Sequence, residues 1–377
     1  MRIGSCTMVQ NYGDWDRYEA EERGEDVPSR PEVSDQSIFL EEVALAQMAD
    51  GLGFDSLWTV EHHFTPYTMV TNPLQLLTYL AGTTNHADLG TMVVVSPWHN
   101  PVRVAEDIIM LDTLLGPDRE VMCGLGRGLG RREYAGLNVD QNEARGRFDE
   151  AIEILEQLLS TGVCTFHGEY FSLDSLRLRP QPERDLSGQL FGAGGTAESV
   201  NIIAANGINP LTIPTVSLDI ALQNAQDFAR IRADAGHGPA QTKLGLWVYC
   251  AETDDQARAG AEQYMVNYAD SALRHYELTG DHFGQLKGYE SYAQLSKMFR
   301  DDTNPFARHF VSDHPWGTPA EVAARIKKIA AEFGAAELML LFKYGAMPAA
   351  TAEASMRLFA EEVMPELHEF NPEPISV

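Results

Sequence analysis

Short apolar runs alternate with longer amphipathic segments along the whole chain. Apolar positions that recur with the helical period, such as Phe39, Val43, Ala46, Ala49 and Leu52, predict helices, whereas runs rich in β-branched residues predict strands. The predicted strands are residues 3–9, 55–60, 89–95, 120–124, 189–193, 210–213, 243–250 and 337–342. The predicted helices are residues 39–52, a segment that opens at Asn72-Pro73, and residues 101–115, 142–159, 196–205, 218–235, 254–272 and 351–363.

Each predicted strand is thus followed by a helix, so the strands run parallel, because each helical crossover returns the chain to the same end of the sheet. Eight such units predict an α/β fold, a closed (β/α)8 TIM barrel, which typically takes about 250 residues. An open doubly wound sheet is the alternative. That fold usually carries a Gly-rich nucleotide loop after its first strand, and here the first strand runs into Met8-Val9-Gln10-Asn11-Tyr12.

The 377 residues leave room for insertions at the C-terminal face of one domain covering residues 1–377, and we expect them near residues 13–35, 164–187 and 273–319. The first is densely charged, which is typical of a solvated loop, with a lid over the barrel mouth as the alternative. The second indicates an excursion with short strands around His167-Gly168. The third is aromatic and weakly periodic, which is typical of a long functional or mobile loop.

Charge and composition narrow the function classes. The balance of 28 Lys+Arg against 55 Asp+Glu gives a net charge of −27, which opposes binding to a nucleic-acid backbone. The sequence has no apolar run of the length that a membrane span needs, and no signal-peptide core, so we expect a cytoplasmic protein. Cys6, Cys123, Cys164 and Cys250 lie far apart, so we expect buried free thiols and no zinc site.

Two histidines stand at the end of the second predicted strand, in Glu61-His62-His63-Phe64. The C-terminal ends of barrel strands carry catalytic residues. Neighbours on a strand point to opposite faces, so His62 and His63 do not easily chelate one ion, and we expect no metal site. An imidazole ordinarily titrates near working pH, which favours a general-base role for one histidine, with a structural pair as the alternative.

Two Gly-rich stretches predict an anion site. Residues 124–132 follow the fourth strand and combine glycines with Arg127, Arg131 and Arg132, whose guanidinium groups match phosphate bidentately. Residues 192–199 lead into a helix through Thr196, where free N–H groups and the helix dipole favour an anion. A flexible turn and a plain helix cap at Thr196 are the alternatives. Because the two stretches follow neighbouring strands, they predict one phosphorylated cofactor held between them.

Further stretches, spread over nearly the whole chain, match one known family in its own order. They are Glu61-His62-His63-Phe64-Thr65 with Asn72-Pro73, Leu89-Gly90-Thr91, Pro101-Val102-Arg103 with Glu106-Asp107, Leu111-Asp112, Gly126-Arg127-Gly128-Leu129, Gly317-Thr318-Pro319-Ala320-Glu321, and Ser355-Met356-Arg357-Leu358-Phe359 with Val363-Met364-Pro365. In these stretches the chain resembles the bacterial luciferase-like flavin monooxygenases, particularly the alkanal monooxygenase branch.

The resemblance implies a set of site residues. His62 matches the family's histidine beside the flavin, thought to act as a base, and Glu133 matches a carboxylate just beyond the phosphate loop. Met92–Val93 falls where the family has a cis non-prolyl peptide under the flavin ring. The implied cofactor-binding residues are Met92, Val93, Arg127, Arg145, Gly195, Thr196 and Ser199.

Three glycines depart from the luciferase pattern. Gly126 stands in place of a reactive cysteine, Gly130 in place of an aromatic residue and Gly195 in place of an acidic one. We expect Gly130 to open space near the site and Gly195 to ease anion binding; the departures together argue against light emission and an aldehyde substrate. The candidates for lining a substrate cavity are Tyr12, Trp98, Trp247 and Trp316.

The function implied by the resemblance is a two-component monooxygenase. Reduced FMN (FMNH2) from a separate flavin reductase would react with molecular oxygen, and the resulting peroxyflavin would oxidise a small organic substrate. A homodimer is also implied. A deazaflavin-dependent hydride-transfer enzyme on the same barrel is one alternative, and its longer acidic cofactor would rely on the Arg127, Arg131 and Arg132 cluster. The others are a non-catalytic flavin-binding subunit, against which His62 argues, and a metallohydrolase.

Overall fold

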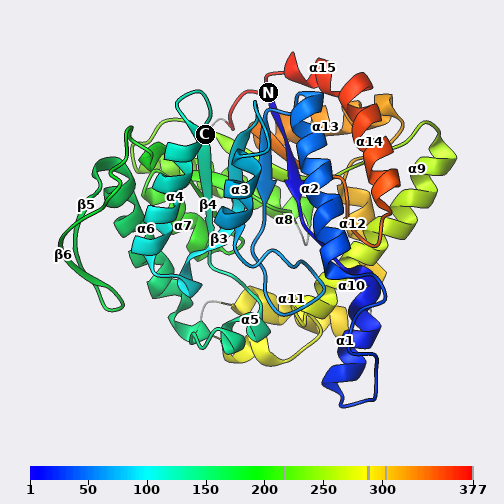
Figure 1. Cartoon of the computed structure of the whole chain (residues 1–377), viewed down its shortest axis with the longest axis horizontal. Coiled ribbons are helices and arrows are strands. Elements are labelled where there is room, and N and C mark those ends of the chain that lie inside the picture. The colour runs from blue at the N-terminus through cyan, green and yellow to red at the C-terminus, as the bar shows by residue number, and fades with distance from the viewer. Residues whose placement is uncertain (215–216, 287–288, 302–303, 376–377) are drawn as a thin grey trace.

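A computed structural model describes residues 1–214, 217–286, 289–301 and 304–375, and a closed parallel barrel lies at its centre (Figure 1). The strand order is β1-β12-β9-β8-β7-β4-β3-β2, and β1 closes the barrel by pairing with both β2 and β12. The strands are β1 (Arg2–Thr7), β2 (Ser56–Thr59), β3 (Asp88–Val95), β4 (Val121–Gly126), β7 (Leu190–Ala193), β8 (Asn209–Thr212), β9 (Thr242–Trp247) and β12 (Ala335–Leu341). The prediction of a (β/α)8 barrel is confirmed, and the alternative prediction of an open doubly wound sheet is wrong.

The outer helices complete the eight βα units. They are α2 (Asp35–Leu52), α3 (Pro73–Ala81), α4 (Pro101–Leu115), α6 (Ala144–Thr161), α7 (Ala197–Ala205), α8 (Leu218–Asp234), α13 (Pro319–Phe333) and α14 (Ala349–Glu362), followed by α15 (Met364–His368). Their starts follow local sequence, since the Asn72 side chain accepts a hydrogen bond from Gln75 N at 2.9 Å while Pro73 occupies the first turn. Across the described ranges, no helix has the length and apolar character needed to cross a membrane.

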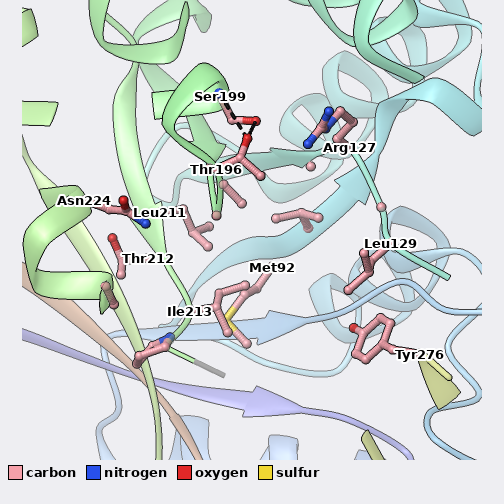
Figure 2. Close-up of a pocket in the computed structure, with 18 of the residues that line it drawn as sticks. Met92, Arg127, Leu129, Thr196, Ser199, Leu211, Thr212, Ile213, Asn224 and Tyr276 are labelled. Carbon is pink, nitrogen blue, oxygen red and sulfur yellow. Dashed lines mark hydrogen bonds between the residues drawn. The ribbon is translucent and has the colours of Figure 1, made fainter. Parts of the chain in front are cut away.

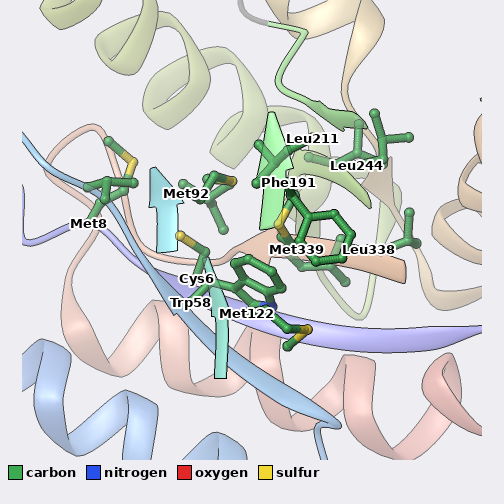
Figure 3. Packing of buried hydrophobic residues seen from close by; sticks show 14 of the residues in the cluster. Cys6, Met8, Trp58, Met92, Met122, Phe191, Leu211, Leu244, Leu338 and Met339 are labelled. Carbon is green, nitrogen blue, oxygen red and sulfur yellow. The ribbon is translucent and has the colours of Figure 1, made fainter. Parts of the chain in front are cut away.

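The barrel interior is filled by large apolar side chains from several strands (Figure 3). Trp58 is fully buried, and its indole N–H donates to Ser56 Oγ at 2.7 Å. Phe191, Leu338 and Met339 pack into the same cluster. This packed interior leaves the carboxyl ends of the strands as the place where an open site can form.

The first and third expected insertions contain more regular structure than the sequence predicts, and the second contains the short strands that it predicts. Residues 13–35 include η1 (Tyr12–Asp14) and the helix α1 (Trp15–Glu22), where Trp15 is buried, so the solvated-loop interpretation is wrong for this part. Residues 164–187 hold most of the antiparallel hairpin of β5 (Val163–His167) and β6 (Ser172–Arg177), which projects from the barrel in Figure 1. The remaining short elements near β3, β4 and β7 are η2 (Ser96–Trp98), α5 (Arg131–Gly136), η3 (Gln141–Glu143) and η4 (Ser187–Gln189).

Residues 273–319 are largely helical, which corrects the prediction of a long irregular loop. The elements there are η6 (His282–Gln285), α11 (Glu290–Asp301), α12 (Asn304–Asp313) and β11 (Trp316–Gly317). β11 pairs with β10 (Tyr249–Cys250), so the predicted strand 243–250 splits, and its last residues leave the barrel. Residues 287–288 and 302–303 lie outside the described ranges.

The predicted helix 254–272 contains an irregularity. It is built from α9 (Asp254–Gly260), a π-helical turn η5 (Ala261–Met265) and α10 (Val266–His275). Just beyond the π turn, in α10, Asn267 Nδ2 donates to the Gly345 carbonyl at 2.9 Å. Turns of this kind are rare and occur frequently at functional sites. α10 supplies Tyr268, Ala272 and His275 to the region described next.

Candidate active site

The carboxyl ends of the barrel strands surround a cavity of about 480 Å³ (Figure 2). That volume lies in the range of small-molecule and cofactor sites, roughly 300–1,000 Å³. Of the site residues predicted from the sequence, those that line the cavity are His62, Met92, Val93, Arg127, Gly195, Thr196 and Ser199. Glu133 and Arg145 lie behind this wall, where each contacts a lining residue.

One end of the cavity gathers cationic and hydroxyl groups. Figure 2 shows Arg127, which follows β4, near Thr196 and Ser199 at the start of α7. Thr196 caps α7, since its Oγ1 accepts from Ser199 N at 3.4 Å. Behind them, Arg145 Nη2 donates to Ser199 Oγ at 3.4 Å and to Glu198 Oε2 at 3.2 Å. The two Gly-rich stretches therefore meet at one place, as predicted.

The electrostatics of this end suit an anion. Burial, followed by the neighbouring positive charge of Arg127, lowers the pKa of the Arg145 guanidinium. Arg145 Nη1 is buried and has no hydrogen-bond partner among the described residues. Arg127 is buried and Arg145 is half-buried, and two such guanidinium groups repel each other unless a negative group lies between them. An anionic ligand would relieve this arrangement.

The other two arginines of the predicted cluster do not contribute, which corrects the sequence analysis. Arg131 forms a bidentate pair with Glu277, with Nε–Oε2 and Nη2–Oε1 distances of 3.0 and 2.6 Å. Arg132 donates from Nη2 to Glu22 Oε2 at 2.9 Å, and from Nη1 to the Arg274 carbonyl at 3.2 Å. Both are bound to other parts of the chain, and Arg127 is the member of the cluster that lines the cavity.

The peptide between Met92 and Val93 is cis, as the resemblance implied. Gly126, on the neighbouring strand β4, explains one departure from the luciferase pattern. A Cβ at Gly126 would lie 2.4 Å from Val93 Cγ2, which is closer than real side chains approach. Glycine is therefore the residue that the packing around Val93 accepts here, and a cysteine would require Val93 to move.

The two histidines of the Glu61-His62-His63 motif turn to different carboxylates. His62 belongs to a group that we call the cavity cluster, made of His62, Glu133 and His275. His63 belongs to a second group, the loop cluster, made of Glu61, His63 and His99. The expectation that neighbouring histidines point apart is confirmed.

In the cavity cluster, the Glu133 carboxylate is fully buried, and two imidazoles that contact each other approach it from one side. Its Oε1 is 3.0 Å from His62 Nδ1 and accepts the backbone N–H of His63 at 2.8 Å. Its Oε2 is 3.5 Å from His275 Nε2. Burial alone would raise the pKa of Glu133, but the two adjacent histidines hold it well below its ordinary value. Glu133 is therefore an ionised carboxylate throughout the neutral range.

Gly130 makes this position of Glu133 possible. A Cβ there would lie 2.2 Å from Glu133 Oε2, so the missing side chain gives its space to the carboxylate. The expectation that Gly130 opens the cavity is wrong. On the far side of His62, Nε2 lies 3.3 Å from the Tyr276 hydroxyl, and both residues line the cavity.

The loop cluster is arranged differently. Glu61 Oε1 is 2.6 Å from His99 Nε2 and 3.3 Å from His63 Nε2, and Oε2 accepts the Val95 backbone N–H at 2.7 Å. Burial would lower the pKa of His99, but Glu61 outweighs burial and raises it. Glu61 borders the cavity, yet its carboxylate is fully buried and all of its oxygens are occupied.

The other walls are mainly apolar. They include Met8, Val60, Tyr67, Trp247, Tyr268, Phe306 and Leu341. Trp247 is the one of the four predicted aromatic candidates that lines the cavity. The other three are wrong: Tyr12 donates to Asp270 Oδ2 at 3.1 Å, Trp316 donates to the Val311 carbonyl at 2.8 Å, and Trp98 packs against His63 and Tyr134. All four cysteines are buried and free, as predicted.

The fold and the site together define a closed (β/α)8 barrel with a pocket at the carboxyl ends of its strands, where active sites of this fold are found. A family profile described as luciferase-like monooxygenase matches residues 24–337. The chain therefore belongs to the luciferase-like monooxygenase family, a family of flavin-dependent oxidoreductases, and the resemblance drawn from the sequence is confirmed at this level.

Individual relatives agree with the family assignment. The alkanal monooxygenase alpha chain of the Kryptophanaron alfredi symbiont is 23% identical over 347 residues, 90% of this chain and 96% of that protein. The oxygenase component of a flavin-dependent trigonelline monooxygenase from Acinetobacter baylyi is 26% identical over 244 residues, 63% of this chain and 67% of that protein.

Solved structures share the fold. The monooxygenase RslO1 of Streptomyces bottropensis has a TM-score of 0.76 at 23% identity, covering 97% of this chain and all 100% of its own. The oxygenating constituent of 3,6-diketocamphane monooxygenase from Pseudomonas putida, solved with FMN, has a TM-score of 0.68 at 19% identity. This match covers 97% of this chain and 98% of that chain. An F420-dependent secondary alcohol dehydrogenase also has a TM-score of 0.68, at 15% identity, and the match covers 96% of this chain and 98% of that chain.

Proposed function

We propose that this protein is the oxygenase component of a two-component monooxygenase. It would use reduced FMN from a separate reductase, together with molecular oxygen, to oxidise an uncharged, largely apolar organic molecule. The observation that carries the proposal is one cavity that combines an anion-suited end, an imidazole held by a buried carboxylate, and apolar walls.

The residues at the anion-suited end fit the phosphate of FMN. Arg127 would pair with it, the hydroxyl groups of Thr196 and Ser199 would donate to it, and Arg145 would supply a second positive charge from behind Ser199. Met92 and Val93, which line the cavity at the end of β3, would pack against the ring. When bound, reduced FMN supplies the electrons that activate oxygen.

His62 is the proton acceptor in this proposal. Its Nδ1 faces the ionised Glu133, so an N–H at Nδ1 donates to the carboxylate and leaves Nε2 as the acceptor on the cavity side. The carboxylate stabilises the imidazolium that forms when Nε2 takes a proton. The apolar walls exclude water and so limit side reactions of activated oxygen.

The substrate class follows from what the remaining walls lack. Among the described residues that line the cavity, the charged or titratable groups besides the phenols are Glu61, His62 and Arg127. Glu61 is committed to the loop cluster, and Arg127 belongs to the phosphate end. A charged substrate would therefore bury its charge without a partner, which is costly, whereas an apolar one gains from burial against Met8, Trp247 and Leu341.

The relatives support FMN more than a deazaflavin, although both cofactors occur on this fold. The diketocamphane enzyme is an oxygenating constituent solved with FMN, and the trigonelline relative is an oxygenase component. The F420-dependent dehydrogenase represents the other chemistry. A longer acidic cofactor tail would need positive charge beyond Arg127, and Arg131 and Arg132 are already paired with Glu277 and Glu22.

The cofactor assignment is tested by anaerobic titration with reduced FMN, reduced riboflavin and a reduced deazaflavin. We expect FMN to bind most tightly. Replacing Arg127 with Ala should weaken FMN binding about ten- to hundredfold, because a hydrogen-bonded charge pair is lost, while riboflavin binding changes little. Arg131→Ala is the matched control and should leave both affinities unchanged. Tighter deazaflavin binding, or equal FMN affinity in the Arg127 variant, would contradict the proposal.

The reaction is tested with purified protein, a flavin reductase, NADH and oxygen. We expect oxygen-dependent product from uncharged apolar substrates only when the reductase is present, and far less from analogues of the same shape that carry a carboxylate or an ammonium group. Flavin binding without product from any compound would favour the non-catalytic subunit. Reduction of a substrate by the deazaflavin without oxygen would favour the hydride-transfer enzyme.

A further inference from the structure

His275 lies in the cavity cluster, although no sequence motif points to it. It is the last residue of α10, is almost completely buried, and stacks on Tyr67 with ring centroids 4.5 Å apart and planes inclined by 13°. Its Nε2 is 3.5 Å from Glu133 Oε2 and 3.2 Å from His62 Nδ1. A second imidazole therefore approaches the carboxylate that faces the proposed base.

The hydrogen bonds around His275 indicate its tautomer. Thr65 Oγ1 lies 2.7 Å from His275 Nδ1 and also accepts the Tyr67 backbone N–H at 3.4 Å. The threonine hydroxyl also has one proton to donate, and His275 Nδ1 lies within reach of it, so we assign Thr65 as the donor. A neutral imidazole that accepts at Nδ1 carries its proton on Nε2. That proton then points to the side where Glu133 and His62 lie.

The protonation state is consistent with this arrangement. Burial, the largest effect, lowers the pKa of His275, and it outweighs the opposing effect of Glu133, so the ring is neutral at pH 7. Glu133 is ionised, and His62 donates its Nδ1–H to Oε1 at 3.0 Å. Because this Nδ1 carries a proton, it cannot accept from His275 Nε2, 3.2 Å away, so the His275 N–H is left with Oε2 at a longer contact distance of 3.5 Å. The other titratable groups near this cluster are the phenols of Tyr67, Tyr134 and Tyr276, and Arg132 faces His275.

We propose that His275 is a positioning residue for the proton acceptor: from the same side as His62 it holds the Glu133 carboxylate through Oε2, so that His62 keeps its proton on Nδ1 and presents Nε2, beside the Tyr276 hydroxyl, as the acceptor at the cavity wall. His275 does not line the cavity, so it acts through Glu133 and not on the substrate. This inference rests on the proposed function only for the identity of the reaction. The tautomer of His62 is a property of the flavin-free chain and can be measured alone.

The first experiment measures that tautomer. Long-range ¹⁵N–¹H NMR of the full chain with ¹⁵N-labelled histidine distinguishes an Nδ1 proton from an Nε2 proton, and His62→Ala and His275→Gln assign the two signals. We expect His62 with its proton on Nδ1 and His275 with its proton on Nε2. A His62 proton on Nε2 in the wild-type protein overturns the proposal, whether or not the monooxygenase reaction has been found.

The second experiment compares two replacements of His275. His275→Phe keeps an aromatic ring on Tyr67 but removes the N–H, whereas His275→Gln places an amide N–H near the position of Nε2. We expect the Phe variant to lose about ten- to hundredfold in kcat with flavin Kd and substrate KM nearly unchanged, and the Gln variant to recover most of the loss. Equal kcat in wild type and the Phe variant, or equal losses in both variants, overturns the proposal.

The pH profile supplies a readout that a purely structural role would not move. His275 is one of the groups that lower the pKa of Glu133, so its removal raises that pKa, and the part of the acid limb of kcat that follows protonation of Glu133 should begin at higher pH in His275→Phe. In Glu133→Gln, adding His275→Phe should cause little further loss, because the residue acts through the carboxylate. Additive losses, an unmoved acid limb, or one equivalent of tightly bound zinc in the wild-type protein would overturn the proposal, since His62, Glu133 and His275 also have the composition of a metal site.

Discussion

The cavity cluster and the loop cluster use the same three groups, a buried carboxylate and two histidines, and yet they differ in what they can do. In the loop cluster, Glu61 is fixed by the Val95 backbone and by two imidazole nitrogens, and its histidines do not line the cavity. In the cavity cluster, His62 has one nitrogen on Glu133 and the other beside Tyr276 at the cavity wall.

One short motif thus contributes residues to both clusters. Glu61, His62 and His63 are consecutive, but alternate residues face alternate sides, so His63 joins the loops after β2 and β3 while His62 joins α5 and α10. The loop cluster connects loops near the cis peptide, and we interpret it as structural. The cavity cluster draws on segments far apart in the sequence, and we interpret it as the catalytic one.

The largest expected effect separates the two clusters by turnover. His62→Ala should lower turnover by at least about a hundredfold, the lower end of what general bases contribute, while flavin binding stays nearly intact. His99→Gln should keep turnover close to wild type, because His99 does not line the cavity. Product formation and flavin titration on both variants provide the measurement. Comparable losses in the two would remove the distinction.

A smaller loss of turnover should follow when the Glu133 carboxylate is displaced while Glu133 itself is kept. Gly130→Ala places a Cβ where Glu133 Oε2 now lies, so the carboxylate must shift away from His62. We expect turnover to fall roughly ten- to hundredfold, as for other small misplacements of reacting groups. Gly188→Ala is the matched control, since a Cβ there meets nothing within 4 Å. Normal turnover in Gly130→Ala would mean that the position of Glu133 is unimportant.

The smallest expected effect concerns stability against pH, and its sign differs between the clusters. The pKa of His99 is raised, so its stabilisation is present below about pH 6.5, the ordinary value, and is lost as pH rises through the folded-state value. The pKa of His275 is lowered, so its contribution is present above about pH 6.5 and is lost as pH falls.

Denaturant unfolding of both glutamine variants between pH 5 and pH 9 measures this difference. The free-energy cost of His99→Gln should be larger at pH 5 than at pH 9, and that of His275→Gln should be larger at pH 9. Parallel pH dependences would contradict the different protonation states of the two histidines.

The sequence contains local signals for much of the site. The alternation of strands and helices predicts the barrel, and His62 stands out because it comes shortly after the end of a strand. Thr196 stands out because glycines precede it and a helix follows. These features depend on neighbours in the chain, so they are visible without a structure. The resemblance added Glu133, Arg145 and the Met92–Val93 peptide, which no local pattern indicates.

His275 could not be found in this way. It lies 213 residues beyond His62, at the end of a helix whose pattern signals only burial. The pairing of Arg131 with Glu277 is likewise a contact between distant segments. The sequence therefore could not show that this arginine is already bound to a carboxylate. The helix α13 is different. Its capping box of Thr318 and Glu321, with Pro319 in the first turn, is a sequence signal for a helix start, and the list of predicted helices does not include this helix.

The π turn of η5 has a consequence for how this enzyme could diverge. A π turn holds one residue more than an α turn, so the extra residue is accommodated in the wider turn, and the side chains of α10 that follow, Tyr268, Ala272 and His275, keep their phase. Deleting one residue within Ala261–Met265 would give an ordinary α turn and leave that wall facing the cavity. Inserting one residue into the regular first turn of α10 would instead rotate the side chains after it by about 100° and present others to the cavity. Changes of length are therefore expected to be tolerated at η5 and to be disruptive in α10.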